Sequence, residues 1–183
     1  MSNPGRVSNR RVYTGRVINL DVDTVRFPNG TTGELEMIRH PGASAVVPFL
    51  SDPAGEDPQV LLIRQYRYAA EGYLYEIPAG RLEKGEDPAV CARRELQEET
   101  GCTARRVDHM YTFYTTPGFT DERIHLFAAI GLTRGETRHE ADEFMETETV
   151  TLSRALSMVE GGEISDGKSA LGILYAAGFL AGR

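Results

Sequence analysis

The amino-acid sequence predicts an α/β protein in which a mixed β-sheet is flanked by helices and preceded by a small antiparallel β-sheet. Strand-like and helix-like segments follow one another without a regular strand–helix–strand rhythm, which favours a mixed sheet over a doubly wound one. The first 40 or so residues hold only strand patterns. A chain of 183 residues has room for one domain, or for one domain with a small appendage. We therefore expect an N-terminal β-sheet region at residues 1–42 and a larger domain at residues 43–183.

The N-terminal region is expected to form a pair of strands. Residues 12–26 alternate and are rich in β-branched residues, and residues 33–39 form the returning strand. Asn29-Gly30 between them is a strong signal for a tight turn. The pair has few large apolar residues, and an isolated hairpin is marginally stable in water, so this sheet must pack on something.

The larger region carries the remaining strand and helix patterns. The expected strands cover residues 44–50, 60–64, 73–77, 106–114, 124–130 and 145–152. The expected helices begin near Pro88, near Ser153 as a cap, and near residue 168, and the last one ends near residue 181. Pro78-Ala79-Gly80 is expected to be a loop that leads toward the first of these helices.

Composition excludes several classes of function. A net charge of −7 argues against binding to nucleic acid or to an anionic membrane, since both need basic surface. The apolar run at residues 170–180 is too short to span a bilayer, and the first eleven residues lack the apolar core of a signal peptide. Cys91 and Cys102 have no histidine at zinc-binding spacing, so we expect reduced thiols and a cytoplasmic protein.

Three carboxylates mark the most informative segment. Glu95, Glu98 and Glu99 are spaced i, i+3 and i+4, so on a helix they share one face and repel one another. A hard cation such as Mg²⁺ would neutralise them. The alternative is an exposed acidic helix with pairs such as Arg94 with Glu98, and spacing alone gives the two interpretations about equal weight.

The complete segment favours the metal site. Residues 80–102 read GRLEKGEDPAVCARRELQEETGC. With Gly80, Glu86 and the string Arg94-Glu95-Leu96-x-Glu98-Glu99-x-Gly101, the segment resembles the Nudix box at every fixed position. Only Cys102 departs from the pattern, because the family usually has a larger aliphatic residue there, and that change affects packing.

Segments outside the box resemble one branch of this family, the ADP-ribose pyrophosphatases. Residues 64–67 place two arginines and a tyrosine at the end of a core strand, a candidate for anion binding and ring stacking, although such side chains also occur on plain strand edges. This segment, the N-terminal strand pair, residues 76–80 and residues 117–122 all match the branch. Pro117, fifteen residues beyond Cys102, is its usual marker, which relatives acting on other nucleoside diphosphate sugars can share.

The resemblance implies a Nudix α/β/α sandwich and a homodimer whose N-terminal strands cross to the partner. It implies hydrolysis of ADP-ribose to AMP and ribose 5-phosphate with Mg²⁺, or with Mn²⁺ in its place. The alternatives are hydrolysis of another nucleoside diphosphate sugar or dinucleotide, and a non-catalytic Nudix module that senses a ligand. Such modules usually have a degraded box, and this one is intact.

The resemblance also implies roles for individual residues. The expected metal ligands are the backbone carbonyl of Ala79 and the side chains of Glu95, Glu98 and Glu99. The expected substrate-binding residues are Arg64, Arg67, Glu76, Pro117, Gly118 and Glu122. The expected catalytic residues are Glu143 as general base, Glu140 as its reserve, Glu98, and Arg94 as the donor that orients the carboxylates.

A second motif suggests a different class of protein, a P-loop nucleotide switch. Residues 162–169 satisfy the pattern G-x-x-x-x-G-K-S and precede a helix. However, a helix and not a strand comes before them, and Glu163 and Asp166 would repel the phosphates. We therefore interpret the segment as a turn between two helices.

The four histidines are scattered and neither cysteine has a triad around it, so covalent catalysis is unsupported.

Overall fold

A computed structural model of the chain describes residues 3–135 and 145–180. Its contacts divide the chain into two compact units. The first combines Met1–Gly42 with Phe113–Arg123, and the second combines Ala43–Thr112 with Ile124–Arg183. The second segment of the first unit was not anticipated, because it interrupts the larger region in the sequence. The division into two domains at residue 42, with a separate role for each, stays a prediction.

The first unit contains a three-stranded antiparallel sheet of order β1-β2-β3. Its strands are β1 (Gly5–Thr14), β2 (Asn19–Arg26) and β3 (Thr32–Arg39). The prediction of one strand over residues 12–26 is wrong, because a turn closed by a 2.9 Å hydrogen bond from Gly15 N to Ile18 O separates β1 from β2. Val17 and Ile18 lie in this turn, and their apolar, β-branched side chains gave it the appearance of a continuing strand.

The second turn of this sheet agrees with the sequence pattern. Gly30 has a φ of +86°, which glycine adopts without strain. The Asn29 side chain accepts a hydrogen bond of 3.0 Å from the backbone N–H of Thr31. The segment Phe113–Arg123 joins the sheet at β3, where the N–H of Ile38 donates to the carbonyl of Phe119 at 2.8 Å.

The second unit is built on a seven-stranded sheet with the order β10-β5-β4-β9-β8, to which β6 is added beside β5 and β7 beside β4. The strands are β4 (Ala43–Phe49), β5 (Gln59–Arg67), β6 (Gly72–Glu76), β7 (Ala79–Arg81), β8 (Cys102–Tyr114), β9 (Arg123–Arg134) and β10 (Met145–Thr151). A short 3₁₀ helix, Tyr68–Ala70, lies between β5 and β6. β4 pairs with β9 in parallel and with β5 and β7 antiparallel, so the sheet is mixed, as predicted.

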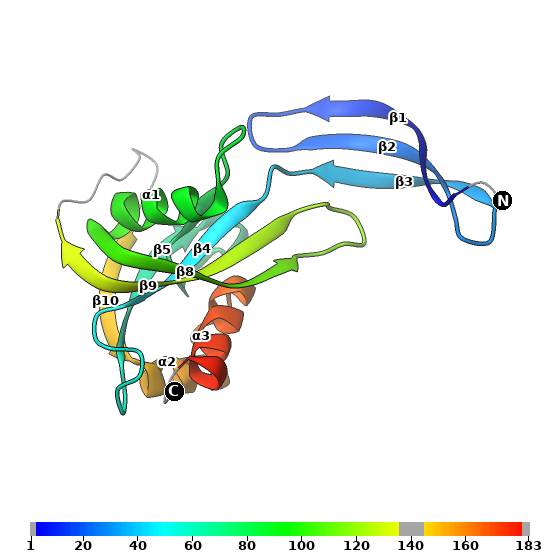
Figure 1. Cartoon of the computed structure of the whole chain (residues 1–183). Coiled ribbons are helices and arrows are strands. Elements are labelled where there is room, and N and C mark those ends of the chain that lie inside the picture. Colours follow the sequence, from blue (N-terminus) through cyan, green and yellow to red (C-terminus); the bar gives the residue numbers. More distant parts are fainter. Residues whose placement is uncertain (1–2, 136–144, 181–183) are drawn as a thin grey trace. The chain divides into compact units, whose positions relative to one another are not determined.

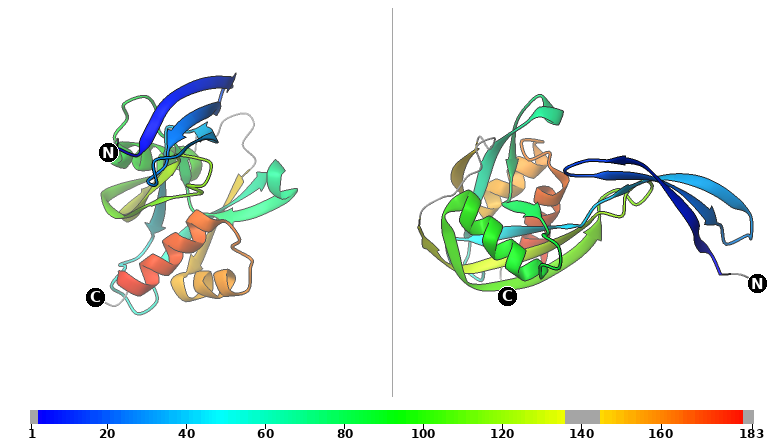
Figure 2. Two further views of the ribbon diagram at one scale, coloured as in Figure 1. Left: turned by 90° about the vertical axis from the view of Figure 1, so that its right-hand side faces the viewer. Right: turned by 90° about the horizontal axis from the view of Figure 1, so that it is seen from above.

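In the part of the chain that the structure describes, three α-helices cover the two faces of this sheet. They are α1 (Pro88–Thr100), α2 (Leu152–Glu160) and α3 (Gly167–Phe179), with α1 on one face and α2 and α3 on the other (Figures 1 and 2). Successive strand residues point to opposite faces. Val46 accordingly packs in the core cluster with Leu96 of α1, whereas Val47 lies against Gly172 of α3. The α/β/α sandwich is confirmed.

Two local expectations are corrected by this unit. Ala79–Arg81 is a short strand and not a loop, because its backbone pairs with Ala43–Ala45 of β4. Thr151, not Ser153, caps α2, since its hydroxyl accepts from Arg154 N, whereas the Ser153 hydroxyl donates to Asp57 at 2.7 Å. In the described parts of the chain, no helix has both the length and the apolar character needed to cross a membrane.

Candidate active site

The box segment folds as the helix α1 because both of its ends are capped. The carboxylate of Asp87 accepts hydrogen bonds from the N–H groups of Ala89 and Val90, and Pro88 occupies the first turn. Gly101 ends the helix in the left-handed conformation with a φ of +70°. These caps fix where the helix begins and ends, and Ala92 and Leu96 pack its apolar side into the core.

The glutamates lie at the border of the buried side of α1. Leu96 is fully buried in the core, and Glu95 and Glu99 are only 9% and 3% exposed. Burial of a carboxylate is costly unless it is paired or binds a cation. Glu98 is more accessible, with 40% of its side chain exposed. Two buried carboxylates on a core-facing helix are not explained by a solvated acidic surface, and the exposed-helix alternative is therefore weaker than the metal-site one.

A pocket of about 300 Å³ gathers the candidate residues. Residues from α1, from β7 with the loop after it, and from the end of β5 line this pocket. They are Arg94, Glu95, Glu98 and Glu99 from α1, Ala79, Gly80, Arg81 and Glu83 from β7 and its loop, and Gln65 and Arg67 from β5. The structure thus brings together all four expected metal ligands, Arg94 and Arg67.

The backbone of β7 lies directly against two of the carboxylates. A Cβ atom placed on Gly80 would be 2.0 Å from Oε1 of Glu95, so only glycine leaves room for that side chain. Oε2 of Glu99 accepts a hydrogen bond of 3.0 Å from the N–H of Ala79. Carboxylate and carbonyl oxygens are the ligands that Mg²⁺ prefers. The donor set of this pocket fits a hard divalent cation.

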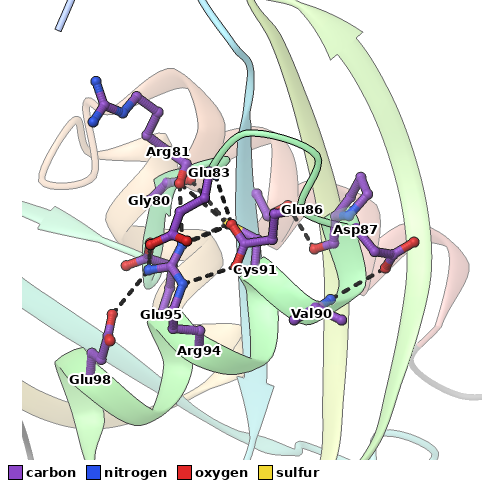
Figure 3. A network of polar contacts seen from close by, with 12 residues as sticks. Gly80, Arg81, Glu83, Glu86, Asp87, Val90, Cys91, Arg94, Glu95 and Glu98 are labelled. Atoms are coloured by element: carbon purple, nitrogen blue, oxygen red, sulfur yellow. Dashed lines mark hydrogen bonds and ion pairs between the residues drawn. The ribbon is translucent and has the colours of Figure 1, made fainter.

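Arg94 occupies the centre of the carboxylate cluster, as Figure 3 shows. Its Nε and Nη2 donate to Glu86 at 3.0 and 3.1 Å, and its Nη1 donates to Glu95 at 2.5 Å and to Glu98 at 3.0 Å. Nη2 also donates to the carbonyl of Arg81. The hydrogen bonds to Glu86 are the largest cause of the raised pKa of Arg94, and Arg94 in turn lowers the pKa of Glu86. Arg94 is placed to orient the carboxylates.

The carboxylates do not form a complete metal centre by themselves. Over residues 3–135 and 145–180, no three His, Cys, Asp or Glu side chains stand in an arrangement that could hold a metal ion. Like charges do not converge without a cation between them, and Arg94 bridges Glu95 and Glu98 instead. A bound Mg²⁺ would require these side chains to turn toward it.

Two of the other expected substrate-binding residues do not line this pocket. Arg64 is exposed with its guanidinium 4.4 Å from the centre of the Tyr73 ring, and it lies three residues before Arg67 on β5, hence on the opposite face of the sheet. Glu76 is 2% exposed and forms ion pairs with Arg67 and Lys168.

The other five expected residues are not among the residues found to line this pocket. Pro117, Gly118 and Glu122 belong to the first unit, where Glu122 Oε1 is 3.2 Å from Nδ1 of His40. Glu140 and Glu143 lie outside the described residues.

Sequence reasoning missed Gln65, which lines the pocket and is 5% exposed. Its Oε1 has no hydrogen-bond partner among the described residues. It is two positions before Arg67 on the same strand, and the period of two along a strand could have identified it. Cys91 is fully buried, and burial, with the charge of Glu86, raises its pKa to about 12, so its thiol stays protonated at neutral pH.

Comparison with known proteins identifies the family. The model of the NUDIX domain matches residues 40–169. The ADP-ribose pyrophosphatase of Bacillus subtilis is 42% identical over 171 residues, which cover 92% of this chain and 90% of that protein. The methanol dehydrogenase activator of Bacillus methanolicus is 40% identical with the same coverage. The chain therefore belongs to the Nudix family.

The fold agrees with this assignment. A crystal structure of an ADP compounds hydrolase superimposes with a TM-score of 0.82 and 19% identity, covering 98% of this chain and 95% of the other. At that identity the likeness concerns the fold alone.

The contact between Gly80 and Glu95 leads to a first prediction. In Gly80→Ala the added methyl group would occupy the position of the Glu95 carboxylate. Because that carboxylate is the far end of a flexible side chain, we expect it to move while the fold persists. The expected result is a loss of turnover of at least tenfold, with a melting temperature within a few degrees of the unmodified protein. Gly85→Ala is not a neutral control because Gly85 has a φ of +79°, whereas Gly167→Ala meets no atom within 4 Å and should be silent.

Proposed function

We propose that this chain hydrolyses the pyrophosphate bond of ADP-ribose and releases AMP and ribose 5-phosphate. The observation that carries the proposal is the single pocket in which Glu95, Glu98, Glu99 and the cationic Arg67 meet. A diphosphate is protected from water by its own negative charge, so a catalyst must supply positive charge and a base. The 42% identical relative named ADP-ribose pyrophosphatase supports the choice of substrate.

The residues of the pocket divide this work. Arg67 binds a phosphate oxygen through its guanidinium. Glu95, Glu98, Glu99 and the Ala79 carbonyl would hold Mg²⁺, or Mn²⁺ in its place. When bound, the cation supplies positive charge to the diphosphate and makes water easier to deprotonate. Arg94 orients the carboxylates through its hydrogen bonds.

The general base is proposed to come from the acidic segment at residues 136–148. In the ADP-ribose pyrophosphatase branch the base often comes from this segment, where Glu143 aligns best and Glu140 is the reserve. Both residues lie outside the described part of the chain, so this assignment depends on the resemblance in sequence.

A substrate screen tests the proposed function. We expect the highest kcat/KM for ADP-ribose and little activity on deoxynucleoside triphosphates, measured by HPLC with Mg²⁺ over ADP-ribose, sugar nucleotides, NADH and dinucleoside polyphosphates. If a sugar nucleotide or a dinucleotide has the highest kcat/KM, the protein is a hydrolase of that compound and not of ADP-ribose. No turnover of any compound, combined with tight binding of one, would favour a ligand-sensing module. The 40% identical methanol dehydrogenase activator makes the complete screen necessary, because that name does not denote a hydrolase of ADP-ribose.

We also propose that the protein is a cytoplasmic homodimer whose N-terminal strands cross to the partner. Cys91 and Cys102 are both free thiols, which agrees with a reducing compartment. Every residue of β1 is exposed within one chain, and Val7, Val12 and Tyr13 are 50–57% exposed. A second chain would bury this apolar surface.

Sedimentation tests the dimer. The full chain is expected to sediment with a mass twice the 20.2 kDa of one copy. A chain without residues 1–40 is expected to sediment as a monomer and to bind substrate much more weakly. A full-length monomer that keeps its activity at nanomolar concentration would end the dimer proposal without affecting the choice of substrate.

A further inference from the structure

The segment that resembles a P-loop has a different use in the structure. Lys168, its lysine, is only 12% exposed and forms ion pairs with Glu76 and, at 2.9 Å, with Asp166. Asp166 caps α3 and accepts from the N–H of Ser169. Its carboxylate therefore occupies the helix N-terminus, where a P-loop would hold phosphate. Nucleotide binding at this segment is not supported.

The same segment attaches α3 to the end of β6 at two adjacent points. The hydroxyl of the fully buried Ser169 accepts a hydrogen bond of 2.8 Å from the N–H of Ile77, and Lys168 contacts the preceding residue, Glu76. Because Ser169 and Lys168 occupy the first turn of α3, the position of this helix end and the position of the Glu76 carboxylate depend on each other.

Glu76 in turn holds Arg67 in the pocket. Its two oxygens accept from Nε at 2.6 Å and from Nη2 at 2.8 Å, a bidentate pair that fixes the plane of the guanidinium. Glu76 is 2% exposed. Burial opposes its ionisation, but Arg67 and Lys168 outweigh that effect and keep its pKa below the ordinary value. The carboxylate remains charged and shared between two cations.

This pairing leaves one edge of Arg67 for a ligand. The Nε–Nη2 edge is taken by Glu76, and among the described residues no hydrogen bond is made from Nη1, although the charge of Glu99 is near enough to help raise the pKa of Arg67. Arg67 lines the pocket beside Glu99 and is 41% exposed at its side chain. The two N–H groups of Nη1 are therefore free to donate to an anion in the pocket.

We propose that Lys168 and Glu76 are positioning residues that hold Arg67 with its Nη1 edge toward the diphosphate. The ion pair with Lys168 fixes the orientation of the Glu76 carboxylate, and the two hydrogen bonds from Arg67 to Glu76 fix the orientation of the Arg67 guanidinium. That the ligand is a diphosphate rests on the proposed function. The proposal adds Lys168, which is 101 residues from Arg67 in the sequence, to the residues that determine binding.

The test measures binding of methylenediphosphonate, a diphosphate that cannot be hydrolysed, by calorimetry to the full chain in metal-free buffer. We expect Lys168→Met to weaken binding about tenfold, the lower end of what is usual when the outer partner of a metal ligand is removed. Lys168→Arg keeps the charge and should bind within about twofold of the unmodified protein. Arg154→Met breaks the exposed ion pair with Glu163 and serves as the control, with no expected change.

A double-mutant cycle separates positioning from a general loss of charge or of folding. If Lys168 acts through Arg67, Lys168→Met should cause no further loss of affinity in an Arg67→Ala background. Full additivity, or unchanged binding by a folded Lys168→Met variant, would overturn the proposal. Absence of diphosphate binding by the unmodified protein would overturn it as well. If the protein binds methylenediphosphonate with this pattern but does not hydrolyse ADP-ribose, the proposed substrate fails and the positioning role stands.

Discussion

Glu99→Gln is expected to reduce kcat by at least two orders of magnitude, the range seen when a key electrostatic group is removed from an active site. The substitution keeps the size of the side chain and an oxygen that can accept from the N–H of Ala79. It removes one of the buried negative charges that would hold the cation. Folding should survive, because loss of one like charge relieves repulsion on α1.

The measurement is steady-state turnover of ADP-ribose over a titration of Mg²⁺, with circular dichroism to confirm the fold. Glu160→Gln, an exposed glutamate at the end of α2, makes the same chemical change outside the pocket and should leave turnover unchanged. Turnover by Glu99→Gln that matches the unmodified enzyme at saturating Mg²⁺ would remove Glu99 from the site.

Glu143→Gln is expected to lower kcat by about 10²- to 10⁴-fold, the usual contribution of a general base. The amide cannot take a proton from water, but it leaves the carboxylates of α1 intact. Apparent affinity for Mg²⁺ should therefore stay near normal, which distinguishes this variant from Glu99→Gln.

Glu140→Gln is the matched control for this prediction because it makes the same change three residues away in the same acidic segment. If Glu140→Gln is the inactive variant and Glu143→Gln is not, the alignment of the segment with the family is wrong and Glu140 becomes the base. Full activity in both variants would exclude Glu140 and Glu143 as the base.

Much of the fold could be predicted because local signals were strong. The start of α1 near Pro88 and the Asn29-Gly30 turn are visible in the sequence, and the structure has them. The turn at residues 15–18 could not be predicted because its apolar residues continue the strand pattern. β7 is too short to show a pattern of its own and exists only because β4 pairs with it.

The candidate site was predictable where its residues are close in the sequence. Glu95, Glu98 and Glu99 share a helix face by spacing alone, and the structure places them in one pocket. The ion pair between Glu76 and Lys168 joins residues 92 positions apart, and only the packing of α3 against β6 brings them together. No periodicity carries such information, so the lysine of the apparent P-loop could be recognised as a support for Glu76 only from the structure.

The most direct test of the central claim is product analysis of ADP-ribose incubated with the purified full chain and Mg²⁺. The account predicts AMP and ribose 5-phosphate in equal amounts, with no product when EDTA replaces Mg²⁺ and at least a hundredfold slower release when Glu99→Gln replaces the unmodified chain. Release of free adenine, or of ADP with ribose, would contradict the account, because the pyrophosphate bond would remain intact. Release of AMP by Glu99→Gln as fast as by the unmodified chain would also contradict it, because the carboxylate pocket would not be needed.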